Sequence, residues 1–75
     1  MTQSQEFIKV EIVDNQKKYV DITLDMSLVA AYSHYIDQTS GLIDTQITQV
    51  FLNGVMGYLL LKITYNDFDD LIQAL

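Results

Sequence analysis

The sequence contains no cysteine and no arginine, and both absences narrow what the chain can be. Without cysteine there is neither a disulfide framework nor a cysteine-based zinc site. Nucleic-acid binders need a positive surface for the phosphates, and arginine is their usual bidentate donor. Ten acidic residues stand against four lysines, which gives a formal charge of −6, so we expect no direct binding to DNA or RNA.

Long hydrophobic runs are also missing. The longest, Leu28–Tyr32 and Tyr58–Leu61, are far shorter than the roughly 20 apolar residues that a membrane span needs. The first six residues contain neither a basic nor an apolar region, so we expect no signal peptide. Because the absence of cysteine is also compatible with the cytoplasm, we predict a soluble, cytoplasmic protein without membrane contact.

The chain is short and rich in apolar residues. Its 75 residues predict a single domain, 1–75, with a disordered N-terminus at 1–5 and a loop at 37–45. A domain of this size buries only about 60% of the surface that its unfolded chain exposes. Since 49% of the residues are hydrophobic, self-association is the simplest further stabilisation, and we predict a homo-oligomer.

Two stretches near the N-terminus alternate between apolar and polar residues. In Phe7–Val13 the apolar residues Ile8, Val10 and Ile12 share one face, and Tyr19–Leu24 follows the same period of two. The polar residues 14–17 between them are typical of a turn. The pattern predicts an antiparallel hairpin.

Residues 25–36, DMSLVAAYSHYI, fit two structures. As a helix, the segment has Asp25 as its N-cap and an apolar stripe that includes Leu28 and Tyr32. As a strand, it has a tight turn at Asp25–Leu28 and an extended segment at Val29–Ile36 with apolar residues on both faces. The helix predicts two ββα units, whereas the strand predicts a small antiparallel sheet or partly closed barrel of four to five strands with a C-terminal helix.

The C-terminal third predicts a second hairpin and a helix. Asn53-Gly54 between the strands Ile47–Leu52 and Tyr58–Ile63 is the sequence signal of a type I′ turn, because both residues tolerate positive φ. Thr64 and Asp67 are spaced as N-cap and N3 of a helix. The apolar residues that follow have the spacing of one helix face: Phe68, Leu71, Ile72 and Leu75.

This C-terminal run, ITQVFLNGVMGYLLLKITYNDFDDLI, resembles the small flagellar and swarming-motility proteins of the FlbD/SwrD type. Their pattern is an apolar strand ending in Asn-Gly, a second apolar strand ending in a hydroxyl or acidic cap, and a short helix. In that family the middle segment is a turn that leads into a strand, so the resemblance implies the strand for Val29–Ile36. The longer loop at 37–45 and the acidic balance depart from the family, and no family site residue is carried over.

No group of residues predicts catalysis, a metal site or a cofactor. His34 follows Ser33 directly, so on a strand the two side chains would point to opposite faces, and a structural role is the simpler interpretation. Asp67, Asp69 and Asp70 lack the glycine and the glutamate of an EF-hand loop, and capping and solvation explain them. We therefore predict a protein that is not an enzyme.

The face of the strands opposite the expected core is unusually apolar for a surface that meets water. Either the sheet curls into a small barrel, or this face is buried against another chain. Interfaces favour tyrosine, phenylalanine and methionine. The residues predicted to form the interface are Phe7, Tyr19, Tyr32, Tyr35, Phe51, Met56, Tyr58 and Leu60.

Two functions follow from these observations. The first is a small acidic protein-interaction module, an adaptor or regulator that binds a protein partner. The alternative is an acidic mimic of nucleic acid that occupies the binding site of a basic DNA- or RNA-binding protein. The two differ in salt dependence, which is strong for the mimic and weak for an apolar interface.

Overall fold

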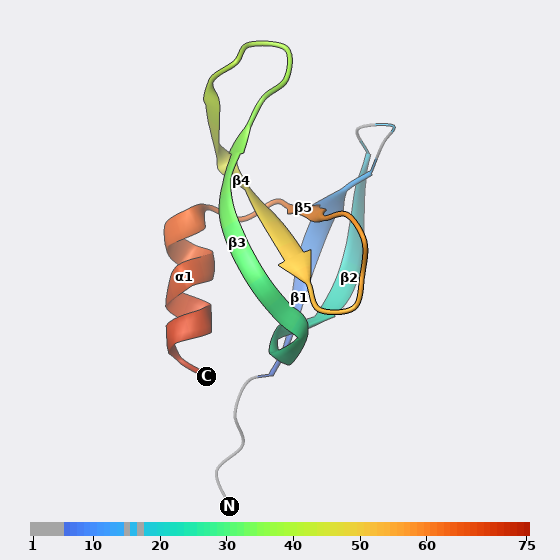
Figure 1. The fold of residues 1–75 in the computed structure, drawn as a ribbon, viewed down its shortest axis with the longest axis vertical. Helices are drawn as coiled ribbons and strands as arrows, with labels where there is room; N and C mark the ends of the chain where they lie inside the picture. The colour runs from blue at the N-terminus through green and yellow to red at the C-terminus, as the bar shows by residue number, and fades with distance from the viewer. Residues whose placement is uncertain (1–5, 15, 17) are drawn as a thin grey trace, which may run out of the picture.

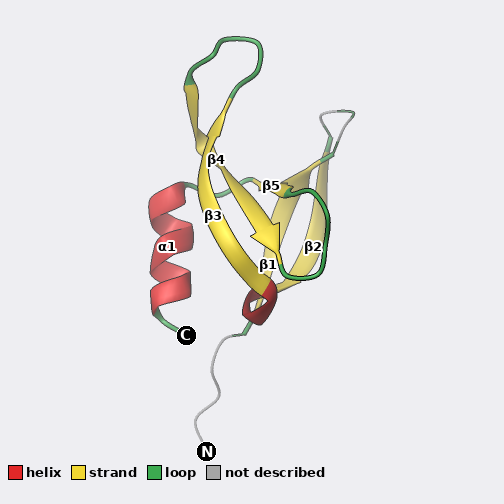
Figure 2. Cartoon of the chain, viewed as in Figure 1, coloured by secondary structure: helices red, strands yellow, loops and turns green. Residues whose placement is uncertain are grey.

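The computed structural model describes residues 6–14, 16 and 18–75 of the chain. They form a five-stranded antiparallel sheet followed by one C-terminal helix, as Figure 1 and Figure 2 show. The strand order in the sheet is β2-β1-β5-β4-β3, so β2 and β3 are edges and the sheet is not closed. The predicted α+β fold with a C-terminal helix is confirmed. The prediction for residues 1–5 lies outside the described residues.

The elements have the following bounds. The strands are β1 Phe7–Val13, β2 Tyr19–Asp25, β3 Val29–Ile36, β4 Ile43–Leu52 and β5 Leu59–Leu61, and the helices are the 3₁₀ turn η1 Met26–Leu28 and α1 Tyr65–Gln73. The short β5 is the middle strand, and it pairs with β1 on one side and with β4 on the other. In Figure 1 the hairpins β1–β2 and β3–β4 turn their connecting ends toward the same end of the sheet.

The predicted N-terminal hairpin is confirmed. β1 and β2 pair from Phe7 opposite Asp25 to Val13 opposite Tyr19. At its turn, Asp14 accepts hydrogen bonds through Oδ1 from the backbone N–H groups of Gln16 (2.9 Å) and Lys18 (2.8 Å).

The segment after β2 is a turn and a strand, so the alternative of two ββα units is wrong. Asp25 caps the single turn η1, and its carboxylate accepts a hydrogen bond from the Ser27 N–H at 3.0 Å. Met26 within the turn is only 2% exposed, and its N–H bonds to the carbonyl of Glu6. Residues of the apolar stripe that suggested a helix lie on both faces of β3, since Tyr32 faces the core and Tyr35 faces the opposite side.

The loop after β3 is shorter than the predicted 37–45, because β4 already begins at Ile43. Ile36 pairs with Ile43, and Tyr35 pairs with Asp44. The pairing then shifts, since the next residue of β3, His34, lies opposite Thr48. The polar composition of residues 44–46 hides this strand from a search for alternation.

The connection between β4 and β5 is a longer loop than the predicted type I′ turn. Val50 pairs with Leu59, which leaves residues 51–58 outside the β4–β5 pairing. Instead, Leu52 pairs with Val29, and the Asn53 N–H donates to the carbonyl of Leu28 at 2.7 Å. The end of β4 is therefore held by β3 and η1. Gly54 and Gly57 supply the positive φ angles of the loop, 76° and 95°.

The C-terminal helix is confirmed with its cap. The Thr64 side chain accepts a hydrogen bond from the Asp67 N–H at 3.2 Å. Phe68 is fully buried and joins a core made by Leu24, Met26, Val50 and Leu61. Buried Thr48 donates through its hydroxyl to the carbonyl of Ile63 at 2.8 Å, which ties β4 to the segment before the helix.

The sheet thus has an inner face, which packs with α1 on this core, and an outer face opposite to it. The outer face is defined by side chains that alternate with the core residues along each strand. They are Phe7, Lys9, Glu11, Val13, Tyr19, Asp21, Thr23, Ser33, Tyr35, Ile47, Gln49, Phe51 and Leu60.

Candidate interaction surface

Most residues predicted to form an interface are exposed. Met56 is 99% exposed, whereas Phe51 and Tyr58 are 37% and 51% exposed. Phe7 and Tyr19 on the N-terminal hairpin are 61% and 52% exposed. These side chains are accessible to a partner.

Three of the predicted residues are less accessible. Tyr35 and Leu60 are half-buried on the outer face. Tyr32 lies on the inner face, where its ring meets Phe68 edge-on at 5.2 Å and its hydroxyl donates to the carboxylate of Asp69. Tyr32 therefore does not belong with the other predicted interface residues, because its ring and hydroxyl contact residues of α1 in the same chain.

The contact between β3 and α1 is aromatic. His34 stacks on Tyr65 with ring centroids 4.4 Å apart and an angle of 21° between the planes. Tyr32 also contacts Tyr65, at 5.4 Å. The hydrogen bond to Asp69, with burial, raises the pKa of Tyr32 to about 12. His34 has a packing role here, as its sequence context suggested.

The loop between β4 and β5 presents apolar side chains at its tip. Val55 and Met56 are exposed there, and Tyr58 at its base contacts the edge of the Phe51 ring at a centroid distance of 6.0 Å. The two positive-φ glycines allow this loop to hold its apolar tip away from the core.

The tip of the β3–β4 hairpin is a second exposed apolar site. Ile36, Leu42 and Ile43 are 54%, 69% and 55% exposed. None of the three was predicted to form an interface, because Ile36 ends the predicted extended segment and Leu42 and Ile43 lie within the predicted loop 37–45. A shallow hollow lined by Ile36, Ile43, Gln49 and Tyr58 connects this tip to the β4–β5 loop.

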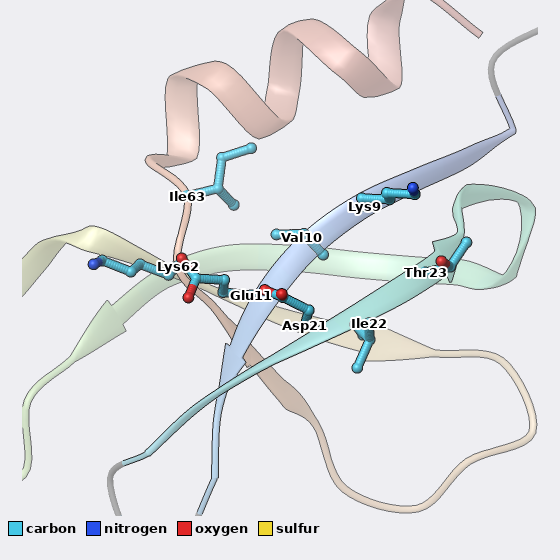
Figure 3. Close-up of a pocket in the computed structure, with 8 residues that line it drawn as sticks. All are labelled: Lys9, Val10, Glu11, Asp21, Ile22, Thr23, Lys62 and Ile63. Carbon is cyan, nitrogen blue, oxygen red and sulfur yellow. The ribbon is translucent and has the colours of Figure 1, made fainter.

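The outer side of the N-terminal hairpin is charged. Glu11 and Asp21 face each other directly across β1 and β2. Together with Lys9, Thr23 and Lys62 they line a shallow hollow, drawn in Figure 3. Figure 3 shows the Lys62 ammonium apart from both carboxylates. It lies over the ring of Tyr19, 4.4 Å from the centroid, in a cation–π contact.

A deeper notch lies between the two hairpins. Its apolar lining takes one residue from each of the five strands, namely Val13, Tyr19, Tyr35, Ile47 and Leu60. Three carboxylates, those of Asp14, Asp37 and Asp44, also line it. No sequence pattern predicted this notch, because its walls come from residues that are distant in the chain.

Within residues 6–14, 16 and 18–75, no group of three or more histidine, cysteine or acidic side chains is placed to hold a metal ion. In the same part of the chain, no helix has both the length and the apolar composition that crossing a membrane would require. Searches of family models, curated proteins and solved structures found no match to this chain. The resemblance to the FlbD/SwrD type therefore stays a prediction.

Proposed function

We propose that the chain is a non-enzymatic protein-interaction module, an adaptor or regulator of the cytoplasm that self-associates through exposed apolar residues. The observation that carries this proposal is the position of α1, which covers the inner face alone. Among the described residues, seven of the twelve large hydrophobic side chains that remain exposed lie at two connected sites, the β3–β4 hairpin tip and the β4–β5 loop with its base. Exposed apolar patches of this kind mark interaction sites.

The surface in question, here called the apolar strip, consists of Ile36, Ile43, Phe51, Met56 and Tyr58. Phe51 contacts Tyr58, and Tyr58 shares a hollow with Ile36 and Ile43, while Met56 lies at the tip of the same loop. The strip runs beside β3, an edge strand whose free side offers backbone hydrogen-bonding groups to another strand. Apolar side chains next to a free strand edge are suited to a protein partner.

A second copy of the chain is the occupant we propose for the strip. Among the described residues, six hydrophobic side chains are buried, five of them in the core, whereas twelve large ones are exposed. A single small domain with such a core is only marginally stable. Pairing two strips would bury apolar surface that the monomer leaves in water.

The test is the oligomeric state of the Tyr58→Asp variant, measured by sedimentation velocity over a range of concentrations. We expect a wild-type dimer and at least a tenfold weaker association of the variant, roughly the effect of losing one central aromatic contact. Tyr19→Asp is the matched control, because Tyr19 has nearly the same exposure, 52% against 51%, and lies outside the strip. It should leave the association unchanged.

Two results would contradict self-association through the strip: a wild-type protein that stays monomeric throughout, or equal weakening by both tyrosine variants. If Tyr58→Asp fails to fold, Met56→Asp replaces it. Met56 is 99% exposed, so a charge there does not disturb the monomer.

The second candidate function is an acidic mimic of nucleic acid. The observation that favours it is the pair of carboxylates from Glu11 and Asp21. Like charges directly opposite each other on neighbouring strands are destabilising, so their placement suggests a role for negative charge on this surface. A mimic would compete with double-stranded DNA for an immobilised basic DNA-binding protein, and salt would abolish its binding. Binding that resists salt and is not displaced by DNA contradicts the mimic.

A further inference from the structure

The notch between the two hairpins has the dimensions and lining of a binding site. Its volume is about 400 Å³, within the range of sites that hold small molecules or single side chains. One wall carries Val13 and Tyr19 from the N-terminal hairpin, and the other carries Tyr35 and Ile47. Leu60 from the middle strand lies between them.

Three carboxylates surround this apolar lining, and the backbone holds each in place. Asp14 accepts from two backbone N–H groups of its turn. Asp37 accepts from Thr39 at 2.7 Å, and Asp44 accepts from Gln46 at 3.0 Å. Every one of these bonds uses Oδ1. Because the carboxylates are fixed before a ligand arrives, a ligand would lose little free energy in ordering them.

The three carboxylates give the notch a negative charge, which favours a cation as its ligand. Asparagine stabilises such turns as well as aspartate does, so turn formation alone does not require negative charge at all three positions. Tyr19, which lines the notch, already has a cation on its ring, since the Lys62 ammonium lies 4.4 Å from its centroid. An apolar hollow with tyrosine walls and an acidic rim is complementary to a side chain that has an apolar stem and a cationic head.

We infer that the notch binds an arginine side chain of a basic partner protein. The planar guanidinium stacks on tyrosine rings and donates to carboxylates in a bidentate geometry, whereas the compact, strongly hydrated lysine ammonium does neither as well. The chain contains no arginine, so a second copy cannot supply this group. The partner at the notch is therefore a different protein from the one at the apolar strip.

This inference rests on the proposed role in protein interaction but uses other residues than the strip. The probe is the blocked peptide acetyl-Gly-Arg-Gly-amide, titrated into ¹⁵N-labelled protein and followed by the backbone amide shifts. Two peptides with the same frame serve as comparisons: one has citrulline, the neutral isostere of arginine, and the other has lysine. We expect shifts at Tyr19, Tyr35 and Asp44, and at least about fivefold weaker binding of the citrulline peptide.

Asp44→Asn is the variant that tests the rim, because the asparagine oxygen still accepts the turn hydrogen bond from Gln46. We expect it to weaken binding of the arginine peptide at least threefold, about the effect of removing one charged partner at an exposed site. Asp67→Asn is the control: it removes the same charge from α1, away from the notch. It should leave binding unchanged.

Several results would overturn the inference: no shift at about 10 mM peptide, equal binding of the arginine, lysine and citrulline peptides, or equal effects of Asp44→Asn and Asp67→Asn. Lysine binding equal to that of arginine would overturn the choice of arginine. Sedimentation of the Asp44→Asn variant separates the two proposals. If the notch proposal is wrong, self-association is still observed. If the strip proposal is wrong, the arginine peptide still binds in the titration.

Discussion

The two faces of the sheet are built from alternate residues of the same strands, yet they have opposite environments. On the inner face, Val50 of β4 and Leu61 of β5 are fully buried beneath Phe68. One position away on the same strands, Phe51 is exposed and Leu60 is only half-buried. A single helix of nine residues can cover one face of this sheet only. Because apolar residues alternate onto both faces, the outer face needs a cover of its own, which we propose to be another protein.

The largest expected effect is a difference in stability between two variants, one that truncates a phenylalanine of the core and one that truncates a phenylalanine of the outer face. Phe68→Ala opens a cavity among Leu24, Val50 and Leu61, so we expect the free energy of unfolding to fall by about 3–5 kcal/mol. Phe7→Ala removes the same ring from a site that is 61% exposed, and we expect a change of less than about 1 kcal/mol. Urea unfolding followed by circular dichroism measures both, and similar losses would contradict the assignment of the two faces.

An intermediate effect concerns the hydrogen bond that joins α1 to β3. The folded protein keeps the Tyr32 proton up to a pKa of about 12, whereas the unfolded chain releases it near about 10. Between these values the unfolded state binds fewer protons, so this contribution to stability is complete below about pH 10 and is lost as the pH rises toward about 12.

The Tyr32→Phe variant isolates this contribution. It should be less stable than the wild type at neutral pH, and the difference should shrink as the pH rises through that window. Urea unfolding at several alkaline pH values measures the difference, and the other tyrosines cancel in the comparison. Parallel curves for the two proteins would show that the hydrogen bond to Asp69 does not stabilise the fold.

The smallest effect has the opposite sign. Asp21→Asn removes the repulsion with Glu11 across the outer face, and we expect the free energy of unfolding to rise by about 0.2–1 kcal/mol. The gain should decrease at high salt, because exposed charges are screened. Asp67→Asn is the contrast, since it removes a charge from the first turn of α1, where negative charge is favourable. If both variants raise the free energy of unfolding, the gain comes from the lower net negative charge of the protein and not from the pair of Glu11 and Asp21.

Local patterns predicted much of the fold, and long-range contacts explain what they missed. Alternation in Phe7–Val13 and the Thr64 cap predicted a hairpin and a helix, because both signals lie within a few residues. The register of β4 depends on β3 and η1, which hold Leu52 and Asn53, and no local pattern contains that information. The same holds for the notch, since Tyr19, Tyr35 and Leu60 line it together although they are distant in the chain.

The position of β5 has a consequence for how the chain reaches this structure. Each hairpin closes over a short stretch of sequence and can form early and separately. They are joined only when the three residues of β5 pair with Ile12 on one side and with Thr48, Gln49 and Val50 on the other. Until that moment β1 and β4 each keep an open edge. We therefore expect the slow step of folding to be the docking of the two hairpins onto β5, a strand that comes after both of them in the chain.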